Sequence, residues 1–125
     1  MSAKRERARS MKSSARSLKG TWKIVWMEQW DQEYVNMVVP GHITFKPEGR
    51  GHFQFGCVEG GFNWSEGDSY FDSRWEGCDE MDEVRGEIYA EIEDCELHGT
   101  IEFDSGDESD FRAVKKFVSQ KAKAP

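Results

Sequence analysis

The sequence predicts an all-β protein, a single eight-stranded antiparallel barrel whose strands follow one another up and down. Three observations support this fold class. Apolar and polar residues alternate with a period of two in segment after segment, which is typical of half-buried strands. Turn residues separate these segments at roughly the 8–12-residue intervals of antiparallel sheets. Apart from residues 30–40, no connection is long enough for a parallel crossover.

The first strand, about 20–28, anchors this prediction. Trp22, Ile24 and Trp26 are two residues apart, so in an extended chain they share one face. Gly20 allows a tight turn immediately before that face begins. We therefore expect the later strands to cover these two indoles.

A short helix or lid is predicted near 31–39, where the alternation of the strands breaks down. The helical spacing i, i+4, i+7, i+8 is followed by Trp30, Tyr34, Met37 and Val38. Asp31 is a suitable N-cap, and Pro40-Gly41 ends the segment.

The remaining seven strands follow from alternation and from turn residues. We expect them at about 42–46, 52–58, 62–64, 70–76, 84–93, 96–103 and 110–118. In this interpretation Glu59-Gly60-Gly61 forms a turn, and residues 77–83 form an acidic loop. Eight strands give a closed barrel without exposed edges, whose interior holds side chains or one small ligand.

Charge is unevenly distributed along the chain, whose formal net charge is −7. Residues 1–19 contain seven basic residues and one acidic residue, which gives +6, whereas the rest contains ten basic and 23 acidic residues, which gives −13. We predict a disordered basic tail over 1–19, the barrel domain over 20–118 and a C-terminal tail over 119–125. A barrel this acidic should repel nucleic acid phosphates.

Cysteine content and hydropathy indicate the compartment. Cys57, Cys78 and Cys95 make an odd number without C-x-x-C spacing, which argues against a disulfide framework and favours a reducing environment. No apolar run approaches the ~18 residues of a membrane helix. We expect a cytoplasmic protein with no membrane partner, and the sequence leaves the oligomeric state open.

The opening Gly20-Thr21-Trp22, at the start of an eight-strand meander, resembles the G-x-W signature of the lipocalin and calycin superfamily. The size of the chain is similar to the intracellular fatty-acid-binding type. The resemblance implies that Trp22 plugs the closed end of the barrel and that a basic residue on the last strand packs across it. Arg112 and Lys115 are the two candidates, and the sequence leaves the choice open.

Four further phrases resemble a group of small bacterial proteins of unassigned function. These are Trp30-Asp31, Gly49-x-Gly51-x-Phe53-x-Phe55-Gly56, Trp75-x-Gly77-x-Asp79-Glu80-x-Asp82 and Gly106-Asp107-Glu108-Ser109. This likeness covers about 20–117 and implies no chemistry.

Motifs for catalysis or metal binding are absent from the sequence. His42, His52 and His98 lack a second ligand at short spacing. The carboxylates of 79–83 do not follow the EF-hand pattern, so we expect a solvated loop. There is no nucleophile motif and no phosphate-binding glycine loop. We therefore predict neither an enzyme, nor a metal site, nor a cofactor.

The sequence is compatible with two functions. The first is an intracellular lipocalin-like barrel that binds a small apolar or aromatic ligand in its interior. The side chains expected to line that site are Trp22, Trp26, Phe45, Phe53, Phe55, Trp64, Phe71 and Trp75, with Ser73 or Lys115 as the polar anchor. The alternative is a protein-interaction module with a filled barrel core, which uses its acidic loops and its basic tail.

Overall fold

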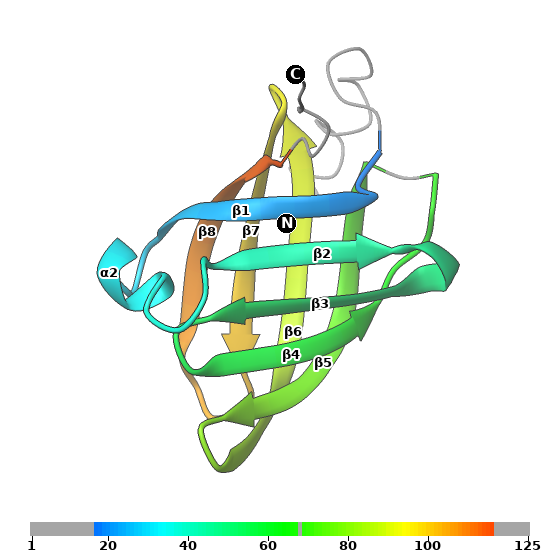
Figure 1. Ribbon diagram of the computed structural model, residues 1–125. Coiled ribbons are helices and arrows are strands. Elements are labelled where there is room, and N and C mark those ends of the chain that lie inside the picture. The colour runs from blue at the N-terminus through cyan, green and yellow to red at the C-terminus, as the bar shows by residue number, and fades with distance from the viewer. Residues whose placement is uncertain (1–16, 68, 117–125) are drawn as a thin grey trace.

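The computed structural model describes residues 17–67 and 69–116 and contains one closed barrel of eight antiparallel strands (Figure 1), which confirms the predicted fold class. Each strand pairs with the next, and β8 pairs with β1 to close the sheet. The strands are β1 (Gly20–Met27), β2 (His42–Lys46), β3 (Arg50–Phe55), β4 (Val58–Asn63), β5 (Tyr70–Asp79), β6 (Asp82–Glu93), β7 (Glu96–Phe103) and β8 (Glu108–Lys115). Two short helices, α2 (Gln32–Val35) and η1 (Pro47–Gly49), lie in connections.

Trp22 closes one end of the barrel, and Lys115 is the basic residue that packs across it. The Lys115 Nζ atom lies 4.7 Å from the centroid of the Trp22 ring and donates a hydrogen bond of 3.0 Å to the Ser17 carbonyl. The Trp22 Nε1 atom donates to the Leu18 carbonyl at 2.8 Å. Burial lowers the pKa of Lys115. These contacts join the first strand to the last.

Residues 17–19, which the sequence analysis placed in the basic tail, take part in this closure. Leu18 is fully buried and belongs to the hydrophobic core. Residues 1–16 of the predicted tail, and residues 117–125 after β8, lie outside the described residues.

The prediction that Trp26 faces the core beside Trp22 and Ile24 is wrong. The pairing of β1 with β8 shifts by one residue between Ile24 and Trp26. Such a bulge turns the following side chain to the opposite face of the sheet. Trp26 is therefore 40% exposed, with the guanidinium of Arg112 stacked 5.7 Å from its ring centroid, and Met27 is buried in its place.

The predicted turn at Glu59-Gly60-Gly61 is also wrong, because β4 runs through these residues. The chain turns earlier, at Gly56, which has a φ of +58° that favours glycine. Gly60 instead provides space, since a Cβ atom there would lie 2.5 Å from the Phe53 ring. Gly56 therefore allows a turn, whereas Gly60 leaves room for the Phe53 ring within a strand.

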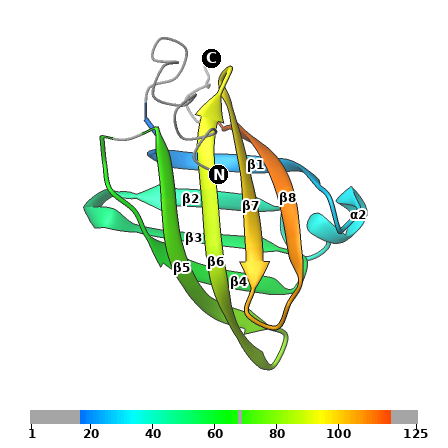
Figure 2. The same ribbon diagram turned by 180° about the vertical axis from the view of Figure 1, so that it is seen from behind.

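The acidic loop predicted over 77–83 is shorter in the structure. β5 continues to Asp79 and β6 begins at Asp82, so only Glu80 and Met81 form the turn. The β5–β6 hairpin is the longest in the barrel and projects beyond the other strands at the bottom of Figure 2. It therefore presents its tip away from the barrel wall.

The helix predicted near 31–39 is present but ends at Val35. The Asp31 carboxylate caps it as expected and accepts a 2.9 Å hydrogen bond from the Tyr34 amide. Val35 is fully buried, whereas Met37 and Val38 are each 55% exposed, so the predicted helical stripe stops after one turn.

We expect His52 on β3 to make the stability of the barrel depend on pH. Its ring lies 5.4 Å from that of His42 on β2. Burial, followed by the positive charges of His42 and Lys46, lowers the pKa of His52, while Glu59 on β4 acts in the opposite direction. The unfolded chain therefore takes up this proton more readily, and stability is lost as the pH falls below about 6.5.

We expect the melting temperature of the His52→Gln variant to fall less steeply than that of the parent between about pH 7 and pH 5. Thermal melts at half-unit pH intervals measure this difference. Parallel profiles for the two proteins would contradict the assignment of pH sensitivity to His52.

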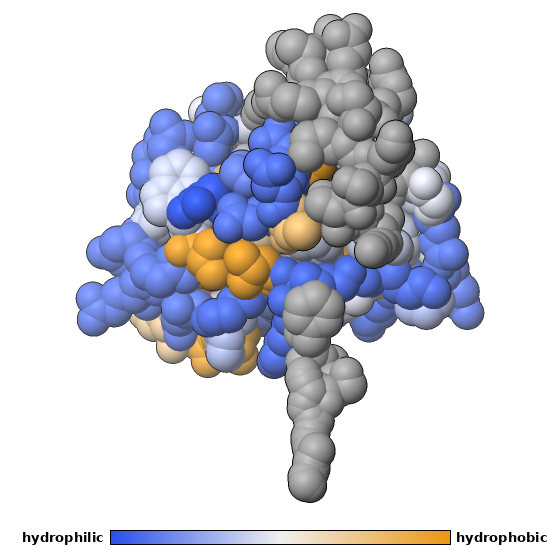
Figure 3. Space-filling view, turned by 90° about the horizontal axis from the view of Figure 1, so that it is seen from above, coloured by the Kyte–Doolittle hydropathy of each residue, from blue (hydrophilic) through white to orange (hydrophobic). Residues whose placement is uncertain are grey.

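Large hydrophobic side chains reach the surface at few places in the described part of the chain. They are Trp26, Met37, Val38 and Met81. The coloured surface in Figure 3 is mostly hydrophilic, with one hydrophobic patch near its centre and another along its lower edge. Within residues 17–67 and 69–116, no helix combines the length and apolar character that crossing a membrane requires.

Candidate functional site

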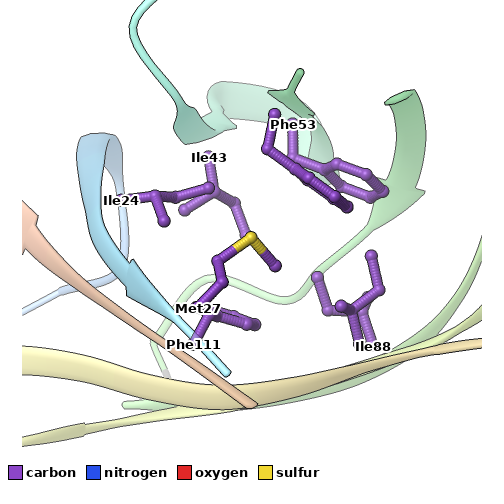
Figure 4. A pocket seen from close by; sticks show the side chains of 8 residues that line it. Ile24, Met27, Ile43, Phe53, Ile88 and Phe111 are labelled. Atoms are coloured by element: carbon purple, nitrogen blue, oxygen red, sulfur yellow. The ribbon is translucent and has the colours of Figure 1, made fainter. Parts of the chain in front are cut away.

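Among the described residues, the barrel interior, which was proposed above as a ligand site, is almost completely filled. Its middle contains a cavity of about 10 Å³, roughly the smallest space that holds one water molecule. The lining side chains are Ile24, Met27, Ile43, Phe53, Phe55, Ile88, Ile101 and Phe111, all of them apolar. In Figure 4 the flexible side chain of Met27 extends into the space between the others.

Only two of the ten predicted site residues, Phe53 and Phe55, line this cavity. Four of the other eight, Phe45, Trp64, Phe71 and Trp75, fill the interior as a network of rings. Phe45 packs edge-to-face on Trp64 and on Phe71, with centroid distances of 5.3 and 5.0 Å. Trp75 lies 5.1 Å from Phe53. These edge-to-face contacts are the preferred geometry of aromatic pairs, so the rings stabilise one another.

The two proposed polar anchors do not line the cavity. The Ser73 hydroxyl donates a 2.9 Å hydrogen bond to the Arg74 carbonyl and lies 3.4 Å from the Asn63 amide, near the surface. Lys115 binds the Ser17 carbonyl at the end closed by Trp22. The lining of this cavity therefore consists of hydrocarbon and aromatic groups alone.

Trp30 and Tyr34 cap the opposite end of the barrel. The Trp30 ring packs 5.0 Å from Phe55 and 6.1 Å from Phe103, between centroids. The Tyr34 hydroxyl accepts a 3.2 Å hydrogen bond from the Cys57 amide, and burial raises the pKa of Tyr34. The segment before and within α2 therefore covers the ends of β3 and β7.

Sequence reasoning missed several residues of the interior. Met27 was hidden by the bulge in β1, since strict alternation places it outside. Phe62 was assigned to a short strand and not to the core, yet its ring lies 4.9 Å from Phe71. Phe103 and Phe111 were not among the predicted site residues, although Phe103 contacts the Trp30 ring and Phe111 lines the cavity.

Groups with catalytic or metal-binding chemistry are poorly placed in the described residues. No cluster of three or more His, Cys, Asp or Glu side chains there is arranged to hold a metal ion. Cys57, Cys78 and Cys95 are thiols that form no disulfide in the described part of the chain. Desolvation and the nearby carboxylate of Glu80 raise the pKa of the Cys57 thiol, whose Sγ atom lies 3.7 Å from that carboxylate. A thiol with a raised pKa is a weak nucleophile.

The comparisons with known proteins leave the family open. No protein-family model matches the chain, and neither the curated proteins nor the solved structures give a significant match.

Proposed function

We propose that this protein is an interaction module, a barrel with a filled core that binds a protein partner through its surface. The observation that carries the proposal is the interior cavity of only about 10 Å³. Drug-sized ligands occupy sites of about 300–1,000 Å³, so an interior guest would require many aromatic side chains to move. A filled, closed barrel is instead a rigid support for the groups on its surface.

The tip of the β5–β6 hairpin is the surface that we propose for the partner. Met81 at the turn is 93% exposed, although it is a hydrophobic residue. Four carboxylates flank it, at Asp79, Glu80, Asp82 and Glu83. An exposed apolar side chain among acidic groups suits a partner with a small hydrophobic pocket bordered by Lys or Arg.

The last residue pair of this hairpin supports the same proposal. Asp79 faces Asp82 directly across the two strands, and like charges in this position destabilise a hairpin. A sequence selected only for stability would avoid such a pair. A basic partner would remove the repulsion on binding.

A single substitution separates the effect of the Asp79–Asp82 pair on stability from its effect on partner binding. Asp82→Lys should raise the melting temperature slightly, because the change removes a repulsion worth about 0.2–1 kcal/mol. The same variant should bind a fluorescent Lys/Leu-rich peptide about tenfold more weakly in anisotropy titrations at low salt. A matched control, Asp94→Lys in the β6–β7 turn, makes the same charge change at the other end of the barrel. Equal losses of peptide affinity in both variants would mean that binding depends only on the net charge of the protein.

A second candidate function is binding of a small apolar or aromatic ligand in the interior. One observation favours it: the cavity has a wholly apolar lining, and a helix of only four residues takes part in the cap above it. A guest would enter as Met27 and the Trp30 cap move aside. Short, locally weak elements are the usual source of such openings.

Native mass spectrometry of the freshly purified protein distinguishes the two candidates. The interaction proposal expects the mass of the chain alone, and it expects naphthalene and decanoate to leave the melting temperature unchanged. A co-purifying small molecule, or a saturable rise in melting temperature with either probe, would favour the interior site. The free thiols are compatible with a reducing compartment, so the cytoplasm remains our proposed location.

A further inference from the structure

A groove on the outer wall of the barrel is much larger than the interior cavity. It has a volume of about 310 Å³ and lies over β1, β2 and the segment that precedes β2. The lining residues are Thr21, Lys23, Val39, Pro40, Gly41, His42, Thr44 and Lys116. This volume is within the range of small-molecule sites.

The charge of the groove is opposite to that of the barrel around it. Lys23 and Lys116 are basic, and none of the described lining residues is acidic. Residues 20–125 nevertheless carry a formal charge of −13. A positive groove on an otherwise negative surface attracts a small anion locally.

Hydrogen-bonding groups accompany these charges. The Thr21 and Thr44 hydroxyls are 3.0 Å apart, and whichever accepts this hydrogen bond keeps its own hydrogen to donate to a ligand. The His42 Nδ1 atom lies 2.9 Å from the Pro40 carbonyl, which can only accept, so Nδ1 carries the hydrogen and Nε2 remains for other contacts.

The backbone holds the two lysines on the same part of the wall. Lys23 pairs with His42 across the β1–β2 register. The Lys116 amide donates a 2.8 Å hydrogen bond to the carbonyl of Thr21, two residues before Lys23 on β1. The remaining wall of the groove is apolar and consists of Val39 and Pro40.

We propose that this groove binds a small organic oxyanion, a carboxylate or a phosphate ester. The anionic group would lie between Lys23 and Lys116 and accept from a threonine hydroxyl. The apolar part would rest on Val39 and Pro40. This site is independent of the hairpin tip and of the barrel interior.

The test is an NMR titration of the ¹⁵N-labelled full chain with benzoate, phenyl phosphate, inorganic phosphate and the neutral analogue benzyl alcohol. We expect saturable shifts at the Thr21, Lys23 and Thr44 amides with the aromatic anions and weaker shifts with inorganic phosphate. Benzyl alcohol should leave these amides unchanged. Whichever of benzoate and phenyl phosphate binds more tightly identifies the anionic group.

Substitutions make the assignment specific. The double variant Lys23→Gln, Lys116→Gln should weaken anion binding about tenfold, since each partly exposed charge pair contributes a modest share of the affinity. Lys46→Gln lies on β2 outside the groove and should leave binding unchanged. Raising the salt from about 0.01 to 0.15 M should also weaken binding. The proposal is overturned if the anions cause no shift, if benzyl alcohol binds equally well, or if the double variant binds like the parent.

Discussion

The Trp22→Ala variant is expected to lose about 3–5 kcal/mol of unfolding free energy, the usual cost of removing a large aromatic side chain from a core. Trp22 is only 1% exposed. The substitution removes the ring under the Lys115 ammonium and the hydrogen bond from Nε1 to the Leu18 carbonyl. Half-buried Lys115 would then lack its aromatic partner. Urea denaturation followed by circular dichroism measures the loss.

Trp26→Ala is the matched control on the same strand. Its ring is 40% exposed and contacts Arg112 from the outside, an arrangement worth about 0.5–1 kcal/mol at the surface. We therefore expect a loss well below that of Trp22→Ala. Equal losses in the two variants would show that the bulge in β1 does not turn Trp26 outward.

Gly77→Ala is expected to cost about 3 kcal/mol or more of unfolding free energy. A Cβ atom at Gly77 would lie 1.7 Å from the Glu59 carbonyl oxygen and 2.6 Å from the Cα atom of Gly60. Both are backbone atoms, which cannot rotate away, so β4 and β5 would have to separate. Overpacking of side chains alone costs about 1–3 kcal/mol. Thermal melts and urea denaturation measure the effect.

Gly61→Ala on β4 tests this explanation. Its nearest atom would be the Gly51 carbonyl oxygen at 3.7 Å, an ordinary contact. Since alanine restricts the unfolded chain more than glycine does, we expect a stability equal to the parent or up to about 1 kcal/mol higher. A large loss at Gly61 would mean that the backbone clash does not explain the cost at Gly77.

Alternation predicted much of the fold because it reports directly which side chains are buried. On β6 the inward set Ile88, Ala90 and Ile92 follows the expected phase, and on β8 Phe111 and Ala113 do the same. The choice between Arg112 and Lys115 required the structure, since both lie near tryptophans of β1. The distance of 4.7 Å between the Lys115 Nζ atom and the Trp22 ring decides in favour of Lys115.

Glycine was the main source of error in the strand boundaries. The same residue type supplies a positive φ at Gly56 and space for a ring at Gly60, and a single sequence does not distinguish these needs. The bulge before Trp26 has no local signal either, because it depends on pairing with β8. Whether the core was filled depended on side-chain volumes summed over all strands, so the interior site remained open until the structure was known.

The contact between Trp22 and Lys115 has a consequence for the order in which the chain acquires its structure during synthesis. Of the eight strands, β1 is synthesised first and its neighbour β8 last. One edge of β1 and one edge of β7 therefore stay unpaired until β8 is synthesised. Contacts between residues so far apart in sequence slow folding. We expect chains released before β8 is complete to associate through these open edges, and the pairing of β8 with β1 and β7 to remove this route to association.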